Sequence, residues 1–141
     1  MTAITAAPIA STTRPGKALN RTLWTLQILL GLFFILASGA PKLVGQADAA
    51  RIFADIGFGT WFMYFTGAVE VAGGIGLMVY RLSGLAALGL SITTVLAAAT
   101  QAFLLDAPGL AIFPLVLAAI FGWIAYQRRD TIDAMWALVK R

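Results

Sequence analysis

The 141-residue sequence contains no cysteine and no histidine, and only 11% of its residues are charged. The lack of thiols and imidazoles excludes disulfides, zinc sites of the usual nitrogen and sulfur kind, and haem ligated by histidine. A soluble domain carries about 25% charged residues, so this chain has too few to cover a water-facing surface. We therefore expect an integral membrane protein that has no redox centre or metal site of its own.

Hydrophobic residues make up 60% of the chain and gather in four long runs that are nearly free of charge. A helix needs about 20 apolar residues to cross the hydrocarbon core of a bilayer. None of the runs alternates between polar and apolar residues, so a small β-barrel is not expected. The sequence predicts an all-α, polytopic membrane four-helix bundle over residues 19–127, with spans at about 22–43, 58–80, 82–105 and 108–127.

The lysines and arginines predict how the bundle is oriented. On the side of the two termini lie eight of them, namely Arg14, Lys17, Arg21, Arg81, Arg128, Arg129, Lys140 and Arg141. The opposite side has Lys42 and Arg51. Because short cytoplasmic segments carry the excess of basic residues, we expect both termini in the cytoplasm. The basic residues are spread over helix ends and form no basic face, so no nucleic-acid partner is expected.

Two segments before the second span lie outside the predicted membrane helices. Residues 1–18 are rich in Thr, Ala, Ser and Pro, contain no aromatic residue and are predicted to form a disordered tail. Residues 48–56 place Phe53 and other apolar side chains on one helical face, which predicts a short helix on the membrane surface. Asp48 is the candidate N-cap of this helix, and Gly57 can end it.

Residues 130–141 form a second amphipathic pattern, which predicts a helix along the cytoplasmic interface. Arg128 and Arg129 just before it are expected to be membrane-surface anchors, and Asp130 is its candidate N-cap. An ordinary tail without a protein partner is favoured over a helix that docks one.

Glu70 lies near the middle of the second predicted span, where an ionised carboxylate costs a few kcal/mol or more. Its neighbours one turn away on either side are small, namely Thr66, Gly67, Gly73 and Gly74. Another helix can therefore approach closely at this point.

Lys42 is the nearest counter-charge and follows Pro41, where we expect the first span to kink or unwind. About 15 Å of helix separates Glu70 from Thr60 at the membrane edge. A direct pair with Glu70 therefore requires Lys42 to lie inside the bilayer, and snorkelling of Lys42 to the outer surface is the equal alternative.

Glu70 has two interpretations at this point. In one, a protonated Glu70 hydrogen-bonds a neighbouring helix and holds the bundle together. In the other, it is a carboxylate or proton site beside a bound headgroup, substrate or quinone. Gln27 is predicted to hydrogen-bond between helices, and Ala72 and Gly76 form a small-residue face that suits either the bundle or a homo-oligomer.

The end of the first span and the residues around Glu70 resemble the DoxX family of small four-helix membrane proteins. Gly39 to Leu43 match the family's Gly-x-x-Lys-Leu pattern, and Gly67 to Glu70 match its Gly-x-x-Glu pattern with small residues after it. The resemblance extends from about Leu23 to Tyr126. It implies that Lys42 and Glu70 are the family's characteristic polar positions.

The family includes the small membrane subunit of thiosulfate:quinone oxidoreductase, and other members are linked to redox defence alongside superoxide dismutase and a sulfurtransferase. The resemblance implies a multi-pass protein of a bacterial inner (cytoplasmic) membrane. It further implies a membrane subunit or anchor of a quinone-linked redox assembly that acts in thiosulfate or thiol oxidation or in oxidative stress. A redox protein would then be its partner, and a quinone would be its candidate ligand. No residue is assigned a catalytic role, and a non-catalytic subunit is expected over a stand-alone enzyme. The alternative is a non-catalytic scaffold, or a carrier or exporter of a small lipophilic molecule.

Overall fold

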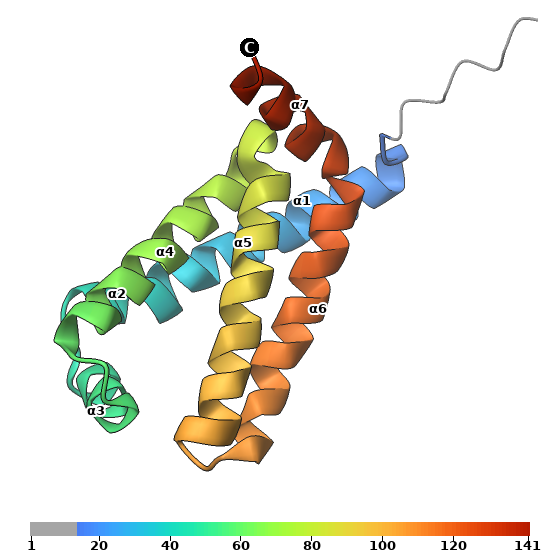
Figure 1. The fold of residues 1–141 in the computed structure, drawn as a ribbon. Coiled ribbons are helices and arrows are strands. Elements are labelled where there is room, and N and C mark those ends of the chain that lie inside the picture. Colours follow the sequence, from blue (N-terminus) through green and yellow to red (C-terminus); the bar gives the residue numbers. More distant parts are fainter. Residues whose placement is uncertain (1–13) are drawn as a thin grey trace, which may run out of the picture.

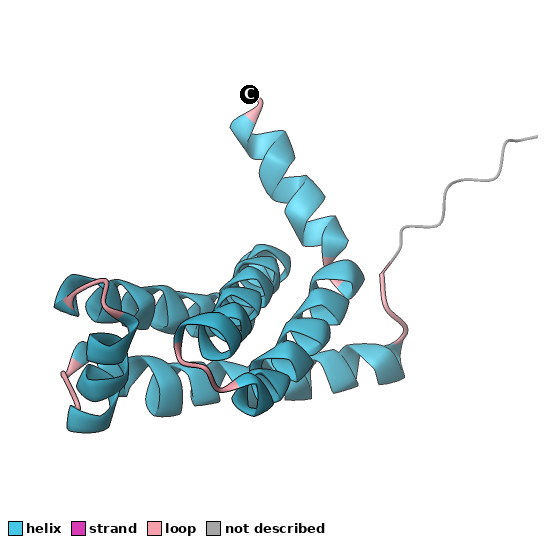
Figure 2. Cartoon of the chain, turned by 60° about the horizontal axis from the view of Figure 1, so that its bottom comes forward, coloured by secondary structure: helices cyan, strands magenta, loops and turns pink. Residues whose placement is uncertain are grey.

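The computed structural model describes residues 14–141, and every regular element in that part of the chain is helical (Figures 1 and 2). These elements are α1 (Lys17–Leu32), the π-helical η1 (Phe33–Gly39), α2 (Ala40–Leu43), α3 (Ala47–Ile56), α4 (Thr60–Met78), α5 (Tyr80–Ala99), the π-helical η2 (Thr100–Leu104), the 3-10 helical η3 (Pro108–Ala111), α6 (Ile112–Gln127) and α7 (Arg129–Val139). Four continuous stretches are long and apolar enough to cross a membrane, namely Lys17–Leu43, Thr60–Met78, Tyr80–Leu104 and Pro108–Gln127. The predicted all-α class with four candidate membrane helices is confirmed.

The first of these stretches stays helical through Pro41. In η1 the hydrogen bonding shifts, so that the N–H of Ala40 donates to the carbonyl of Ile35, five residues earlier. Pro41 then stands in the first turn of α2, where its missing N–H is tolerated, and Gly39 keeps a helical backbone at φ −78 and ψ −48. Of the expected kink or unwinding, the unwinding is wrong, because a π-helical turn accommodates the proline and the chain stays helical.

The four long helices form two pairs that cross. Figure 1 shows α5 and α6 antiparallel, with α1 passing obliquely behind them and α4 spreading away from α5 below the turn that joins them. The core at the crossing is built of large apolar side chains, among them Leu23, Phe34, Leu77, Leu90, Phe121 and Ile124. The rings of Phe34 and Phe121 meet edge to face with centroids 5.3 Å apart, which joins the first span to the last.

Helix α3 occupies almost the residues expected of it. Gly57 ends it in the left-handed conformation at φ +85, as the sequence suggested. Asp48 is not its N-cap, because the helix begins one residue earlier and Gln46 takes that place without a side-chain cap. The Asp48 carboxylate lies instead in the first turn, where it interacts favourably with the helix dipole. The side chain of Phe53 is buried, and its ring lies 5.7 Å from that of Phe62 in α4.

The two ends of the described chain meet at one end of the bundle. Arg128, between α6 and α7, donates a hydrogen bond to Asn20 in α1. The predicted disordered tail over residues 1–18 is wrong for residues 17 and 18, since Pro15 and Gly16 precede a helix that begins at Lys17. Residues 1–13 of that predicted tail lie outside the described part of the chain.

Candidate functional site

Lys42 and Glu70 form an ion pair between α2 and α4. The Lys42 Nζ donates to Glu70 Oε2 at 2.7 Å, to the Ser38 carbonyl oxygen at 3.0 Å and to Ser38 Oγ at 3.1 Å. All three ammonium protons therefore have partners. Glu70 is 7% exposed, and its partner is half-buried. Lys42 therefore pairs directly with Glu70 and does not snorkel to the outer surface, which was the alternative.

The direction of side chains on a helix explains how Lys42 reaches Glu70. Side chains tilt toward the helix N-terminus, so that Lys42 lies back over the turn of Ser38, four residues earlier. The backbones of Gly39 and Gly67 are in contact at the same level, and Glu70 follows Gly67 by one turn. Lys42 is therefore level with the interior of α4 rather than with its first residue.

Two pairs of glycines hold the first span against α4 on either side of Glu70. A Cβ atom on Gly67 would lie 3.0 Å from the Gly39 carbonyl oxygen and 2.9 Å from Lys42 Cβ. A Cβ atom on Gly74 would lie 2.7 Å from the Gly31 carbonyl oxygen. Close backbone approach of this kind is what small residues allow in membrane helices. It brings the carboxyl group of Glu70 within hydrogen-bond distance of Lys42.

The other small residues around Glu70 serve different contacts. Thr66 donates its hydroxyl to the Phe62 carbonyl of its own helix at 2.8 Å. A Cβ atom on Gly73 would lie 2.7 Å from the side chain of Leu90 in α5. Gly76 likewise packs on α5, where its Cβ would lie 2.8 Å from that of Ala86. Gly76 therefore packs inside the chain and is not free for a homo-oligomer.

The pair carries one transferable proton. Within residues 14–141, Glu70 Oε2 accepts the hydrogen bond from Lys42, whereas Oε1 has no hydrogen-bond partner. With the proton on Lys42 both groups are charged, and with the proton on Glu70 both are neutral, so the net charge is zero in either state. A site of this kind can exchange a proton inside a medium of low dielectric without leaving an uncompensated charge.

A second polar cluster lies at the opposite end of the bundle, and the sequence did not reveal it. Its centre is Arg128, which is 1% exposed. The guanidinium donates from Nε to Gln27 Oε1 and from Nη1 to Asn20 Oδ1, both at 2.9 Å. Its Cζ lies 5.5 Å from the ring centroid of Trp24 and 5.2 Å from that of Tyr80. Arg128 is therefore not the surface anchor that its position at a span end suggested.

The same cluster connects further elements. Gln27 donates to the carbonyl of Leu77 in α4 at 2.7 Å, which confirms that it bridges helices. Asp130 accepts from the hydroxyl of Tyr80 at 2.9 Å, so it is bonded to α5 and is not the N-cap of α7, a position that Arg128 takes. Burial lowers the pKa of the Arg128 guanidinium, while the nearby Tyr80 and Asp130 oppose that shift.

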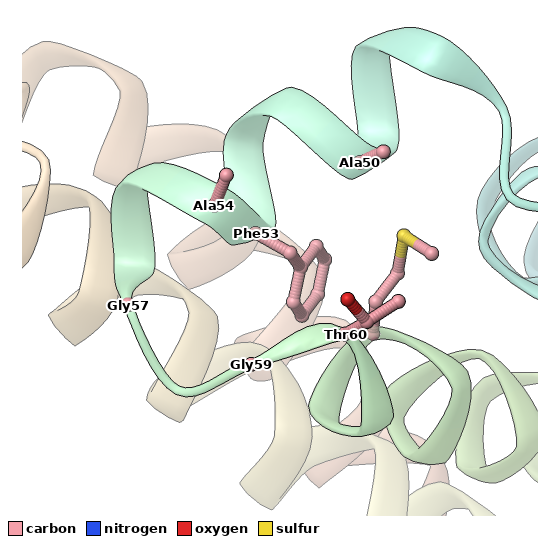
Figure 3. Close-up of a pocket in the computed structure, with 7 residues that line it drawn as sticks. Ala50, Phe53, Ala54, Gly57, Gly59 and Thr60 are labelled. Atoms are coloured by element: carbon pink, nitrogen blue, oxygen red, sulfur yellow. The ribbon is translucent and has the colours of Figure 1, made fainter.

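A pocket of about 340 Å³ lies between α3 and the start of α4 (Figure 3). It is lined by Ala50, Phe53, Ala54, Gly57, Gly59, Thr60 and Met63. Thr60 supplies the one polar side chain in this lining. Ten residues of α4, or about 15 Å, separate Thr60 from Glu70. The pocket is therefore separate from the ion pair.

The fold and the buried ion pair define a polytopic, all-helical membrane protein with a paired lysine and glutamate between its first two membrane helices. The sequence matches the model of the DoxX-like family over residues 25–123, and the chain belongs to that family. No curated protein and no solved structure matches the chain. The matched range contains both Lys42 and Glu70.

Proposed function

We propose that this DoxX-like protein is the membrane subunit or anchor of a quinone-linked redox assembly. It would lie in an inner membrane with its termini in the cytoplasm, and the pair of Lys42 and Glu70 would face the quinone. One observation supports this role above others: an ion pair is held between helices that are long and apolar enough to cross a bilayer. Charged groups at such depth are expensive and mark functional sites by default. Tight packing of two helices needs no charge, since the glycine contacts already provide it.

The residues fit a quinone headgroup chemically. A quinone, when bound, takes up electrons together with protons, and its carbonyl oxygens accept hydrogen bonds. The bond from Lys42 to Ser38 Oγ is the contact that a ligand carbonyl can replace without unpairing a charge. Glu70 Oε1, which no group in residues 14–141 contacts by a hydrogen bond, is the atom that can hold a proton.

The electrons must come from another protein. The chain has no cysteine to serve as a redox-active thiol and no histidine to ligate a haem. A partner that oxidises thiosulfate or thiols would supply the electrons, and this chain would provide the membrane site. It is then a non-catalytic subunit.

A second candidate function, a scaffold or a carrier of a small lipophilic molecule, is favoured by a different observation. Lys42 already satisfies all three of its donors within the chain, as a purely structural lock between helices would. In that case Glu70 would contribute to stability without contacting any ligand.

Native mass spectrometry of the protein released gently from its own membrane distinguishes the two functions. Wild-type protein should retain a quinone or a redox partner, and Glu70→Gln should lower the retained quinone at least tenfold because the proton site is lost. Asp106→Asn is the matched control, since it removes an exposed carboxylate in the loop before α6 and should leave the quinone in place. Wild-type protein that carries only phospholipid, or Glu70→Gln protein that keeps its quinone, would contradict the quinone role and favour the scaffold.

A further inference from the structure

Helix α7 is fixed to the bundle at its first turn. The buried Thr131 hydroxyl donates to the Arg128 carbonyl at 2.7 Å and accepts from the N–H of Gly84 in α5 at 3.1 Å. A Cβ atom on Gly84 would lie only 2.5 Å from Thr131 Oγ1, so the two helices touch without an intervening side chain. The bond between Asp130 and Tyr80 adds a second link. The direction in which α7 leaves the bundle is therefore set by the bundle itself.

The apolar face of α7 continues beyond this attachment. Ile132 is half-buried against Gly84, whereas Val139, seven residues later on the same side of the helix, is 74% exposed and Leu138 beside it is 61% exposed. Figures 1 and 2 show α7 projecting from the end of the bundle toward the C-terminus. Trp136 at the border of this face is 59% exposed. No element within residues 14–141 covers these side chains.

Basic side chains surround this end of the bundle. Those that are exposed are Arg14, Lys17, Arg21, Arg81, Lys140 and Arg141. Their placement follows from the contacts of Arg128 with α1 and of Asp130 with Tyr80, which bring the ends of all these elements together. Asp133 is the one exposed carboxylate of α7, and the basic side chains at this end of the bundle outnumber it. An apolar face bordered by net positive charge is complementary to a layer of anionic phospholipid headgroups.

We propose that the distal apolar face of α7, formed by Leu138, Val139 and Trp136, is an interaction surface for the anionic lipid layer that borders the bundle. The membrane helices of the bundle also expose large apolar side chains, which lipid of the same bilayer covers. The hydrogen bonds of Thr131 to Arg128 and Gly84 hold this face over the lipid. Lys140 and Arg141 then contact the headgroups. This inference does not depend on a quinone.

The test uses the full-length protein labelled at single introduced cysteines, which is straightforward because the chain has none of its own. Val139→Cys places an environment-sensitive bimane on the apolar face, and Ala137→Cys places the same label on the opposite face as a matched control. Both proteins are studied in nanodiscs of phosphatidylcholine alone and of phosphatidylcholine mixed with phosphatidylglycerol. Because the bundle sets the direction of α7, we expect doxyl-labelled phosphatidylcholine to quench the label at position 139 in both kinds of nanodisc. In the mixed nanodiscs, doxyl-labelled phosphatidylglycerol at the same content should quench this label more strongly, and neither lipid should quench the label at 137.

Adding Lys140→Gln to the Val139→Cys protein should reduce the preference for doxyl-labelled phosphatidylglycerol over doxyl-labelled phosphatidylcholine by about fivefold, the contribution of one basic residue near an anionic surface. Lys140 is exposed, so this change should not affect folding, which circular dichroism can check. Equal quenching by the two doxyl-labelled lipids in the mixed nanodiscs would overturn the anionic-lipid preference. An unquenched label at position 139 in both kinds of nanodisc would overturn the lipid surface altogether and indicate a protein partner.

Discussion

Gly31 of α1 and Gly74 of α4 face each other so closely that a Cβ atom on either residue would lie within 2.8 Å of the other's carbonyl oxygen. The contact is between backbones, and no rotation of a flexible side chain can relieve the overlap. It lies one turn from Glu70 and thereby helps to fix the separation of the two helices that share the ion pair.

Replacing Gly74 with alanine should therefore destabilise the bundle. We expect Gly74→Ala to lower the free energy of unfolding in mild detergent by about 1–3 kcal/mol, the usual range for overpacking. Gly89→Ala in α5 is the control, because a Cβ there meets no atom within 4 Å. That variant should be neutral or slightly more stable, since alanine is the better helix former. Equal effects of both variants would contradict a close contact between α1 and α4.

Removing one member of the ion pair should cost more than removing both. Glu70→Leu leaves the Lys42 ammonium without a carboxylate, and breaking a buried pair in this way costs about 3–5 kcal/mol. The double variant Lys42→Met with Glu70→Leu should recover most of that loss, as measured by thermal unfolding of the wild type, both single variants and the double variant. Additive effects of the single substitutions would show that the two residues are not coupled.

The same double variant distinguishes a purely structural role of the ion pair from a role in binding a quinone. If the pair is a quinone site, the double variant should be as well folded as the wild type and should still lack retained quinone. If the pair is only a lock between helices, ligand retention should follow stability through the whole series. Mass spectrometry and thermal unfolding of the same samples provide the two measurements.

Arg128 and its neighbour Arg129 should respond differently to substitution. Arg128→Ala leaves the buried oxygen of Gln27 and that of Asn20 without their donor, and each unsatisfied group costs about 1–3 kcal/mol. We expect a loss of about 2–5 kcal/mol in the free energy of unfolding. Arg129 bonds only the exposed Tyr126 carbonyl and stacks on its ring, so Arg129→Ala should change stability by less than about 0.5 kcal/mol. Similar losses for both arginines would show that Arg128 acts as a surface anchor after all.

The predicted orientation can be tested with single cysteines on the two short helices. Ala54→Cys in α3 and Ala137→Cys in α7 are both exposed positions on opposite sides of the expected membrane. With both termini in the cytoplasm, a membrane-impermeant maleimide applied to intact cells should label only the Ala54→Cys protein. Labelling of the Ala137→Cys protein alone would mean that the chain is inserted the other way round.

The four membrane helices and the crowding around Glu70 could be predicted from sequence because both depend on residues that are close along the chain. Charge-free runs show the spans, and the spacing of Gly67, Glu70 and Gly74 on one helix shows the face that another helix approaches. Gln27 could be predicted to bridge helices because its amide has no partner within its own helix.

The depth of Lys42 and the burial of Arg128 could not be predicted in the same way. Lys42 reaches Glu70 only because the first span continues through a π-helical turn and contacts α4 at Gly39. Arg128 bonds residues that precede it by 101 and 108 positions, so its surroundings follow from the tertiary packing of α1. A basic residue at the end of a span otherwise indicates a surface anchor.

The pair of Lys42 and Glu70 also constrains how the chain enters the bilayer during synthesis. The glutamate follows the lysine by 28 residues, so the ribosome releases it only after α3 has been made. A first helix left alone in the hydrocarbon would hold an ammonium group with no carboxylate to neutralise it. We therefore expect the first two membrane helices to leave the translocon together as a hairpin, with α3 as its translocated tip, before α5 and α6 are added.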